Sequence, residues 1–207
     1  MDDPRPTIFV VDDDPSVRDA ISNLLEAVGM QTRVFGSTEE FQRAIRPDVP
    51  SCLVLDMKLP GMSGLQLQES LEHAGIRIPI VFITAFADVP MTSKAMKAGA
   101  IEFLVKPFQK QELLTAIQEG LERDRAWREE QTEIAELRAK FEELTARERE
   151  VMELVAAGLI NKQVGVQLGL SEVTVKIHRG RVMQKMGAAS LADLVRMSDK
   201  LKPKASK

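Results

Sequence analysis

The amino-acid sequence predicts an α/β protein: a doubly wound five-stranded parallel sheet, a long helical linker and a second, smaller all-α domain. Five short β-rich runs alternate with helical patterns over residues 1–121, as in sheets whose parallel strands are joined by helices. Apart from the second, these runs are continuously apolar, which is typical of strands covered by helices on both faces. Residues 144–207 contain helical patterns only.

Local patterns predict the individual elements of the sheet domain. Residues 16–27 place apolar side chains on one helical face, and Asp14 before Pro15 is typical of a helix N-cap and first position. Capping boxes predict further helix starts at Ser37 and Ser63, where Glu or Gln follows three residues later. The predicted strands are residues 7–11, 31–35, 52–56, 80–84 and 102–105.

Composition excludes several protein classes. With 44% hydrophobic and 29% charged residues, the 207-residue chain has the composition of a globular protein. Its longest apolar stretch, residues 78–87, is far shorter than the ~20 residues of a membrane helix, and residues 1–6 lack signal-peptide character. The single cysteine, Cys52, rules out an internal disulfide and fits a reducing compartment. We therefore expect a cytoplasmic protein without a membrane partner.

The charge is distributed unevenly along the chain. Residues 1–121 carry a net charge of −6 and residues 122–143 one of −3, whereas residues 144–207 carry +6. A basic block beside an acidic one suggests separate tasks, with nucleic acid as the partner of the basic block.

Polar residues gather at the predicted carboxyl ends of the strands, where such sheets bind their ligands. Asp12 and Asp13 end the first strand, Asp56 the third and Thr84 the fourth, and Lys106 follows the fifth. Packed carboxylates need a cation, and Mg²⁺ prefers carboxylate and phosphate oxygens. The set predicts phosphoryl transfer to the third-strand aspartate, although a lone aspartate at a strand end is also typical of a cap or turn.

Four motifs, VVDDD, VLDMKLPGMSG, FITAF and FLVKPF, resemble the receiver domain of bacterial two-component response regulators over residues 7–121. The resemblance implies a flavodoxin-like fold with Asp56 as the phosphoacceptor. It also implies that Mg²⁺ is bound by Asp12, Asp13, Asp56 and the backbone carbonyl of Lys58.

The same resemblance implies a switch that reports phosphorylation. Its members would be Thr84 and Phe103, and the bond between Lys106 and Pro107 would be cis. From the residues alone, a buried strand threonine and a core aromatic explain the first two equally well.

The sequence pattern of the basic third of the chain predicts four helices. A capping box at Thr145 opens the first, Gly169 supplies a turn after the second, and Ser171 caps a third helix that ends near residue 186. Two helices joined by a short Gly-containing turn are typical of the helix-turn-helix, whose second helix enters the DNA major groove. A basic helix face alone is equally typical of a solvated surface. The third helix carries Lys176, Arg179, Arg181 and Lys185.

The string LTxRExEV…GLxNKxV…LxLSxxTVKxH…KM is similar to the LuxR/FixJ/NarL-type DNA-binding domain over residues 144–201. The similarity implies that Lys176 and Ile177 face bases. It implies a supporting role, in backbone contacts or packing, for Asn161, Lys162, Thr174 and His178.

Two arginines and a glycine complete the predicted recognition helix. Arg179 and Arg181 lie further along the helix, where we expect phosphate contacts. Gly180 departs from the family pattern, in which a larger and often basic residue is common. The set of base-reading residues is therefore left open at this position.

Residues 122–143 are rich in Glu, Arg and Ala and lack Pro and Gly, which argues against a flexible linker. From Trp127 to Leu144, large side chains recur at spacings of three and four residues, about two heptads of a coiled-coil seam. Two interpretations stay open: a coil between two copies, or one amphipathic helix packed on its own domains. Starting near Lys110, the helix would contain about 34 residues and extend ~50 Å.

We expect a phosphorylation-activated transcription regulator with a receiver domain (1–121), a helical linker (122–143) and a DNA-binding domain (144–207). Its partners would be a sensor histidine kinase, a second copy of the chain when phosphorylated, and double-stranded promoter DNA, with RNA polymerase a further candidate. The competing enzyme hypothesis is an aspartyl-nucleophile phosphatase, but Lys58 stands where its general acid would be needed. The basic third argues against a purely protein-binding module.

Overall fold

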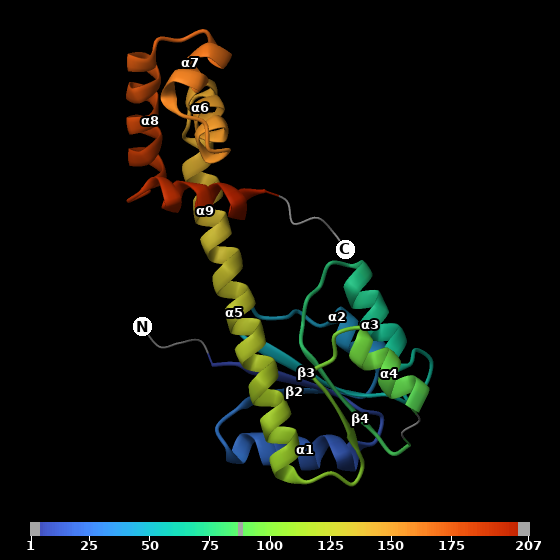
Figure 1. Cartoon of the computed structure of the whole chain (residues 1–207). Coiled ribbons are helices and arrows are strands. Elements are labelled where there is room, and N and C mark those ends of the chain that lie inside the picture. The colour runs from blue at the N-terminus through green and yellow to red at the C-terminus, as the bar shows by residue number, and fades with distance from the viewer. Residues whose placement is uncertain (1–4, 87–88, 203–207) are drawn as a thin grey trace. The chain divides into compact units, whose positions relative to one another are not determined.

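The computed structural model describes residues 5–86 and 89–202 (Figure 1). The chain divides into two compact units, Met1–Arg128 and Glu129–Lys207, which are described separately. Within the described ranges, no helix combines the length and the apolarity that crossing a membrane requires.

The first unit contains one parallel sheet of five strands in the order β2-β1-β3-β4-β5. This confirms the predicted doubly wound sheet, because a strand order that reverses beside β1 requires helices on both faces. The strands are β1 (Thr7–Val11), β2 (Gln31–Phe35), β3 (Ser51–Asp56), β4 (Ile80–Thr84) and β5 (Glu102–Val105).

Two hydrophobic cores flank the sheet, because neighbouring strand residues point to opposite faces. Val10 and Val54 pack on one face with α1 and α5, whereas Phe9 and Leu55 pack on the other with α2, α3 and α4. Figure 1 shows α2, α3 and α4 grouped on the side of the sheet away from α1. The helices are α1 (Pro15–Ala27), α2 (Thr38–Arg43), α3 (Gly64–His73), α4 (Val89–Lys97) and α5 (Lys110–Glu142).

Side-chain caps begin α1, α2 and α3. The Asp14 carboxylate accepts a hydrogen bond from the Ser16 amide at 2.8 Å, as the sequence predicted. Ser63 forms a complete capping box, and its partner at position 66 is a glutamine. At Ser37 only half of the predicted box forms, because the Glu40 carboxylate accepts from the Gly36 amide instead.

A buried carboxylate joins α5 to the start of β3. Asp124 is 1% exposed and accepts hydrogen bonds from the Ser51 amide at 2.9 Å and from Arg128 Nε at 2.7 Å. A backbone N–H at a strand end needs an acceptor when it is buried, and this side chain supplies one. The interaction fixes the last turns of α5 that belong to the first unit.

The second unit is built from helices around one core. Its central residues include Val151, Val175, Val182 and Met186, all fully buried. The chain turns between α7 and α8 at Gly169, whose φ of 67° lies in the left-handed region that glycine tolerates. The helices after α5 are α6 (Ala146–Ala156), α7 (Asn161–Leu168), α8 (Glu172–Met186) and α9 (Leu191–Leu201).

Four large side chains of the suggested coiled-coil seam pack inside the two units. Trp127 lies in the first unit, where the Arg77 guanidinium is 5.6 Å from its ring centroid. Leu137 and Leu144 are 5% and 3% exposed in the core of the second unit, and Phe141 packs against the same core. Helix α5 has 33 residues, close to the predicted length. These contacts favour the interpretation of a helix packed on its own domains.

Candidate functional site: an acidic cluster and a recognition helix

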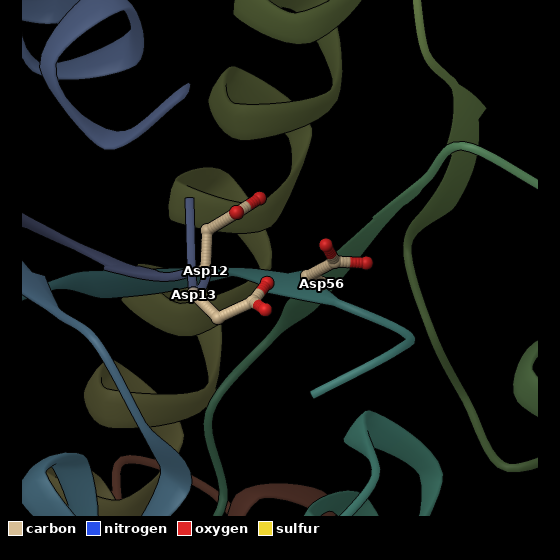
Figure 2. Close-up of side chains that lie close together, drawn as sticks. All are labelled: Asp12, Asp13 and Asp56. Carbon is tan, nitrogen blue, oxygen red and sulfur yellow. The ribbon is translucent and has the colours of Figure 1, made fainter. Parts of the chain in front are cut away.

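Three carboxylates meet at the carboxyl ends of β1 and β3, as Figure 2 shows. Asp12, Asp13 and Asp56 each offer an oxygen within 4.8 Å of the others. Asp12 is fully buried and Asp56 is 7% exposed, whereas Asp13 is exposed to solvent. β1 and β3 are neighbours in the sheet, so their ends lie side by side. The cluster is therefore a consequence of the strand order.

Lys106 supplies the counter-charge to this cluster from the loop after β5. Its Nζ lies 2.5 Å from Asp12 Oδ2 and 2.9 Å from Asp56 Oδ2. The peptide bond between Lys106 and Pro107 is cis, as the family resemblance implied. The second oxygen of Asp56 accepts from the Lys58 amide at 3.1 Å. The backbone of Lys58 therefore lies beside the acidic cluster.

Burial and charge act against each other in this cluster. Burial raises the pKa of Asp12, although hydrogen bonds from Lys106 and from the Asp14 amide act to lower it. Burial also acts to lower the pKa of Lys106, but the two carboxylates outweigh it and the pKa is raised. The lysine is thus held as an ammonium between two acidic groups. Such a site can bind further cations or the oxygens of a phosphoryl group.

Thr84 and Phe103 are both packed near this edge of the sheet. Thr84 is fully buried, and its hydroxyl donates to the Phe86 carbonyl at 3.1 Å and accepts from the Phe86 amide at 3.3 Å. The Phe103 ring is partly buried, and its centroid is 6.4 Å from that of Phe82. The Thr84 carbonyl also accepts from the Lys106 amide at 2.7 Å. Thr84 is therefore hydrogen-bonded to the residue that supplies the counter-charge, and Phe103 packs against β4.

Two residues that were not predicted as site residues, Phe86 at the end of the FITAF motif and Arg18, also belong to the site. Phe86 is 69% exposed, and Lys58 Nζ lies 4.5 Å from the centroid of its ring. Arg18 Nη1 donates to the Asp12 carbonyl at 2.6 Å. The signals available in the sequence were positional: Phe86 follows Thr84 by two residues, and Arg18 lies one helical turn after the α1 N-cap.

The second unit presents α8 with one buried and one open face. Lys176 and Arg181 are exposed, and their side chains make no hydrogen bond or ion pair with any described residue. Ile177 is 52% exposed, so part of its apolar side chain lies on the open face. Arg179 Nη1 donates to Asn161 Oδ1 at 3.3 Å and so joins α8 to α7.

The remaining predicted DNA contacts are spread over α7 and α8. Lys162 is exposed on the first turn of α7, and the Thr174 hydroxyl lies 2.8 Å from that of the α8 N-cap residue. His178 Nδ1 is buried and has no hydrogen-bond partner among the described residues. Lys185 is bound to Glu148 of α6 at 2.7 Å, so its ammonium is used within the unit.

Comparison with known proteins identifies both units. Residues 8–118 match the family described as "Response regulator receiver domain", and residues 142–198 match "Bacterial regulatory proteins, luxR family". The first match alone covers more than half of the chain. This chain belongs to the LuxR-type response regulators. It is therefore a DNA-binding transcriptional regulator of a two-component system and not an enzyme.

Relatives of this response regulator match over nearly its whole length. "Nodulation protein W" of Bradyrhizobium diazoefficiens is 55% identical over 94% of this chain and 86% of its own. "Transcriptional regulatory protein FixJ" of Rhizobium meliloti is 40% identical over 93% of this chain and 94% of its own. The solved structure of "Response Regulator StyR" is 50% identical, covers 95% of this chain and 99% of its own, and has a TM-score of 0.81.

Proposed function

We propose that this response regulator accepts a phosphoryl group on Asp56 from a sensor histidine kinase and then dimerises on promoter DNA. An Asp56 oxygen attacks phosphorus, the P–N bond to the kinase histidine breaks, and the released imidazole takes up a proton. The observation that carries the proposal is the ammonium of Lys106 between Asp12 and Asp56, 2.9 Å from the attacking carboxylate. It is in place to neutralise charge on the transferring group.

The oxygen donors at this edge fit Mg²⁺. Asp12, Asp13 and Asp56 would hold the ion together with the backbone carbonyl of Lys58, and their oxygens already lie within 4.8 Å of one another. Hard cations of this size prefer such carboxylate and carbonyl oxygens. When bound, Mg²⁺ would offset the charge of the carboxylates and of the phosphoryl oxygens.

Phosphorylation would be reported by Thr84 and Phe103. The Thr84 hydroxyl is now bonded within its own loop, and a phosphoryl oxygen on Asp56 would compete for it as an acceptor. Thr84 and Phe103 lie on the paired strands β4 and β5, so a change at Thr84 would reach Phe103 through this pair of strands. A new surface at β5 would then favour association of two receivers.

On DNA, the dimer would present two copies of α8 to half-sites about one helical turn apart. Lys176 and Ile177 would face bases, while Arg179 and Arg181 would contact phosphates. Asn161, Lys162, Thr174 and His178 would support these contacts from α7 and α8. RNA polymerase would be a further partner at the promoter, and a regulator of this kind would act in the cytoplasm, beside the chromosome.

The phosphoacceptor is tested by labelling with acetyl phosphate and measuring the mass of the intact protein. Asp56→Asn should show no added phosphoryl group, because the nucleophilic carboxylate oxygen is lost. Asp19→Asn, on an exposed position of α1, is the matched control and should label normally. Stable labelling of the Asp56 variant at the level of the unchanged protein would remove this residue from its role.

The groove contacts are tested by measuring binding across single-base variants of a selected DNA fragment and across salt concentrations. Lys176→Ala should lose preference at one base position, at a cost of about 1–3 kcal/mol. Arg181→Ala should weaken all sequences alike and lower the salt slope by about one unit. If the two variants behave in the opposite way, the proposed orientation of α8 is wrong.

A further inference from the structure

Gly180 stands in the middle of α8, where the fold gives no reason for a glycine. A Cβ placed there would have no described atom within 4 Å, beyond the backbone of its own helix. Its backbone is not in the left-handed region that requires glycine elsewhere in this unit. A glycine inside a helix also lowers helix stability relative to alanine. The fold would therefore accept, and even prefer, a side chain at this position.

Other glycines of the same unit are explained by the fold. At Gly165 a Cβ would lie 2.7 Å from the Leu170 carbonyl oxygen, too close for any side chain. Gly169 and Gly187 have φ angles of 67° and 71°. Gly180 differs from all three, so its lack of a side chain has to be explained by something outside the described fold.

The position of Gly180 on α8 shows which surface lacks the side chain. Val175 and Val182 are fully buried on one face of the helix. Gly180 falls on the opposite face, one turn from Ile177 and two turns from Val173, because helix neighbours recur every three to four residues. Val173 is 70% and Ile177 52% exposed. The glycine therefore extends an exposed apolar strip along the open face of α8.

We infer that this strip, Val173, Ile177 and Gly180, packs against thymine methyl groups, and that Gly180 marks the closest approach of α8 to the base edges. The inference rests on the proposed function, in which α8 enters the major groove. In that groove the thymine C5-methyl is the apolar group that a base pair presents, and apolar side chains recognise it by contact. Phosphate oxygens would instead favour a cation, such as Arg181 beside the strip.

The missing side chain allows this contact sterically. The major groove admits an α-helix, and a side chain at position 180 would lie between the backbone of α8 and the base edges. Gly180 presents only its Cα hydrogens, and its larger neighbours Ile177 and Val173, one and two turns earlier in α8, can then reach thymine methyl groups. A side chain at position 180 would hold α8 away from the groove floor.

The contact is tested first on the DNA. Fragments that the acetyl-phosphate-treated protein selects from a random pool are resynthesised with deoxyuridine in place of each thymidine in turn, which removes only the methyl group. At one or two positions per half-site, affinity should fall about three- to fivefold, as expected for one buried methyl group. Unchanged affinity at every position would overturn the inference.

The protein side is tested with Gly180→Ala and Gly180→Gln. Both should raise the melting temperature, because each improves the helix. Gly180→Gln should nevertheless weaken binding to the selected fragment at least about tenfold, as expected for several contacts of this size lost together. With this variant, replacing thymidine by deoxyuridine should no longer change the affinity. Its binding to unrelated DNA should stay the same. Ala135→Gln, at an exposed position of α5 in the same unit, adds the same bulk away from α8 and should leave binding unchanged.

The outcomes separate this inference from the proposed function. If Gly180→Gln binds the selected fragment as tightly as the unchanged protein while Lys176→Ala loses base preference, α8 reads DNA and the methyl contact alone is wrong. If the protein selects no DNA fragment, the proposed function itself is wrong, and the inference that rests on it is wrong as well. A lower melting temperature for Gly180→Ala would show that the fold does need this glycine, which would also overturn the inference.

Discussion

At the scale of single residues, α5 packs closely against the sheet of the receiver because one of its residues, Gly120, has no side chain. Cys52 of β3 is fully buried, and Gly120 of α5 lies directly against it: a Cβ on Gly120 would come 2.7 Å from Cys52 Sγ and 3.4 Å from Pro79 Cβ. Burial raises the pKa of the Cys52 thiol to about 12, so it remains a neutral, apolar packing group. The glycine therefore has a steric role that is absent at Gly180.

Gly120→Ala should destabilise the receiver. The added methyl group overlaps a buried sulfur, and overpacking of this kind costs about 1–3 kcal/mol, partly offset by the better helix propensity of alanine. Urea unfolding followed by circular dichroism measures the change. Cys52→Ala combined with Gly120→Ala should cost less than the sum of the two single variants, because removing the sulfur relieves the overlap. Additive effects would show that the two residues do not compete for the same space.

At the scale of elements, the start of α6 is held by a carboxylate with two tasks. Glu148 is 2% exposed; it completes the Thr145 capping box and also accepts from Lys185 Nζ of α8 at 2.7 Å. One side chain thereby satisfies a helix N-terminus and joins α6 to α8. The interaction stabilises the packing of the recognition helix rather than its contact with DNA.

Glu148→Gln should lower the stability of the second unit in a pH-dependent way. The hydrogen bond from Lys185, followed by the Thr145 amide, lowers the pKa of Glu148 from 4.5 to about 2. The ionised form is therefore favoured by folding, so its stabilisation is complete above about pH 4.5 and is lost as the pH falls towards 2. Glutamine keeps the cap but not the charge. We expect a loss of about 1 kcal/mol at pH 7 that disappears near pH 2.

Thermal unfolding of the full chain between pH 2 and 7 measures this difference. Glu150→Gln is the matched control, since Glu150 is exposed and pairs with Arg147 on the same helix. Its effect should be small at all pH values, as for other surface ion pairs. A stability difference for Glu148→Gln that is constant from pH 2 to pH 7 would contradict the ion pair.

The elements themselves were largely predictable from the sequence. Strand patterns and capping residues depend on neighbours along the chain, and β1, β2, β4 and β5 begin and end at the predicted residues. The acidic cluster was also predictable, because strand ends meet at one edge of a parallel sheet. The hydrogen-bond and packing partners of individual side chains were not predictable. The sequence does not show whether the Glu40 carboxylate accepts from the amide of residue 37 or of residue 36. It also does not show whether Leu137 faces a second copy or its own core, because that depends on distant parts of the fold.

At the scale of the whole molecule, charge restricts how phosphorylation can act. Residues 1–121 carry a net charge of −6 and residues 144–207 one of +6, so the basic part is suited to DNA and the acidic part is not. A phosphoryl group on Asp56 adds negative charge to the acidic part. It cannot raise DNA affinity by direct attraction to phosphates. The proposed association of two chains would instead raise the affinity, because it joins two α8 helices on one DNA.

Phosphorylation should thus raise the dimer fraction and the DNA affinity together. Sedimentation with and without acetyl phosphate should show a monomer that becomes a dimer, and affinity for a two-half-site fragment should rise at least about tenfold, since joined sites gain up to about 10²–10⁴ in avidity. Asp56→Asn is the control and should stay monomeric. The burial of Leu137 and Leu144 in the second unit leaves too few large side chains for a permanent coil. A dimer that forms without any phosphoryl group would contradict this and restore the coiled-coil interpretation of the linker.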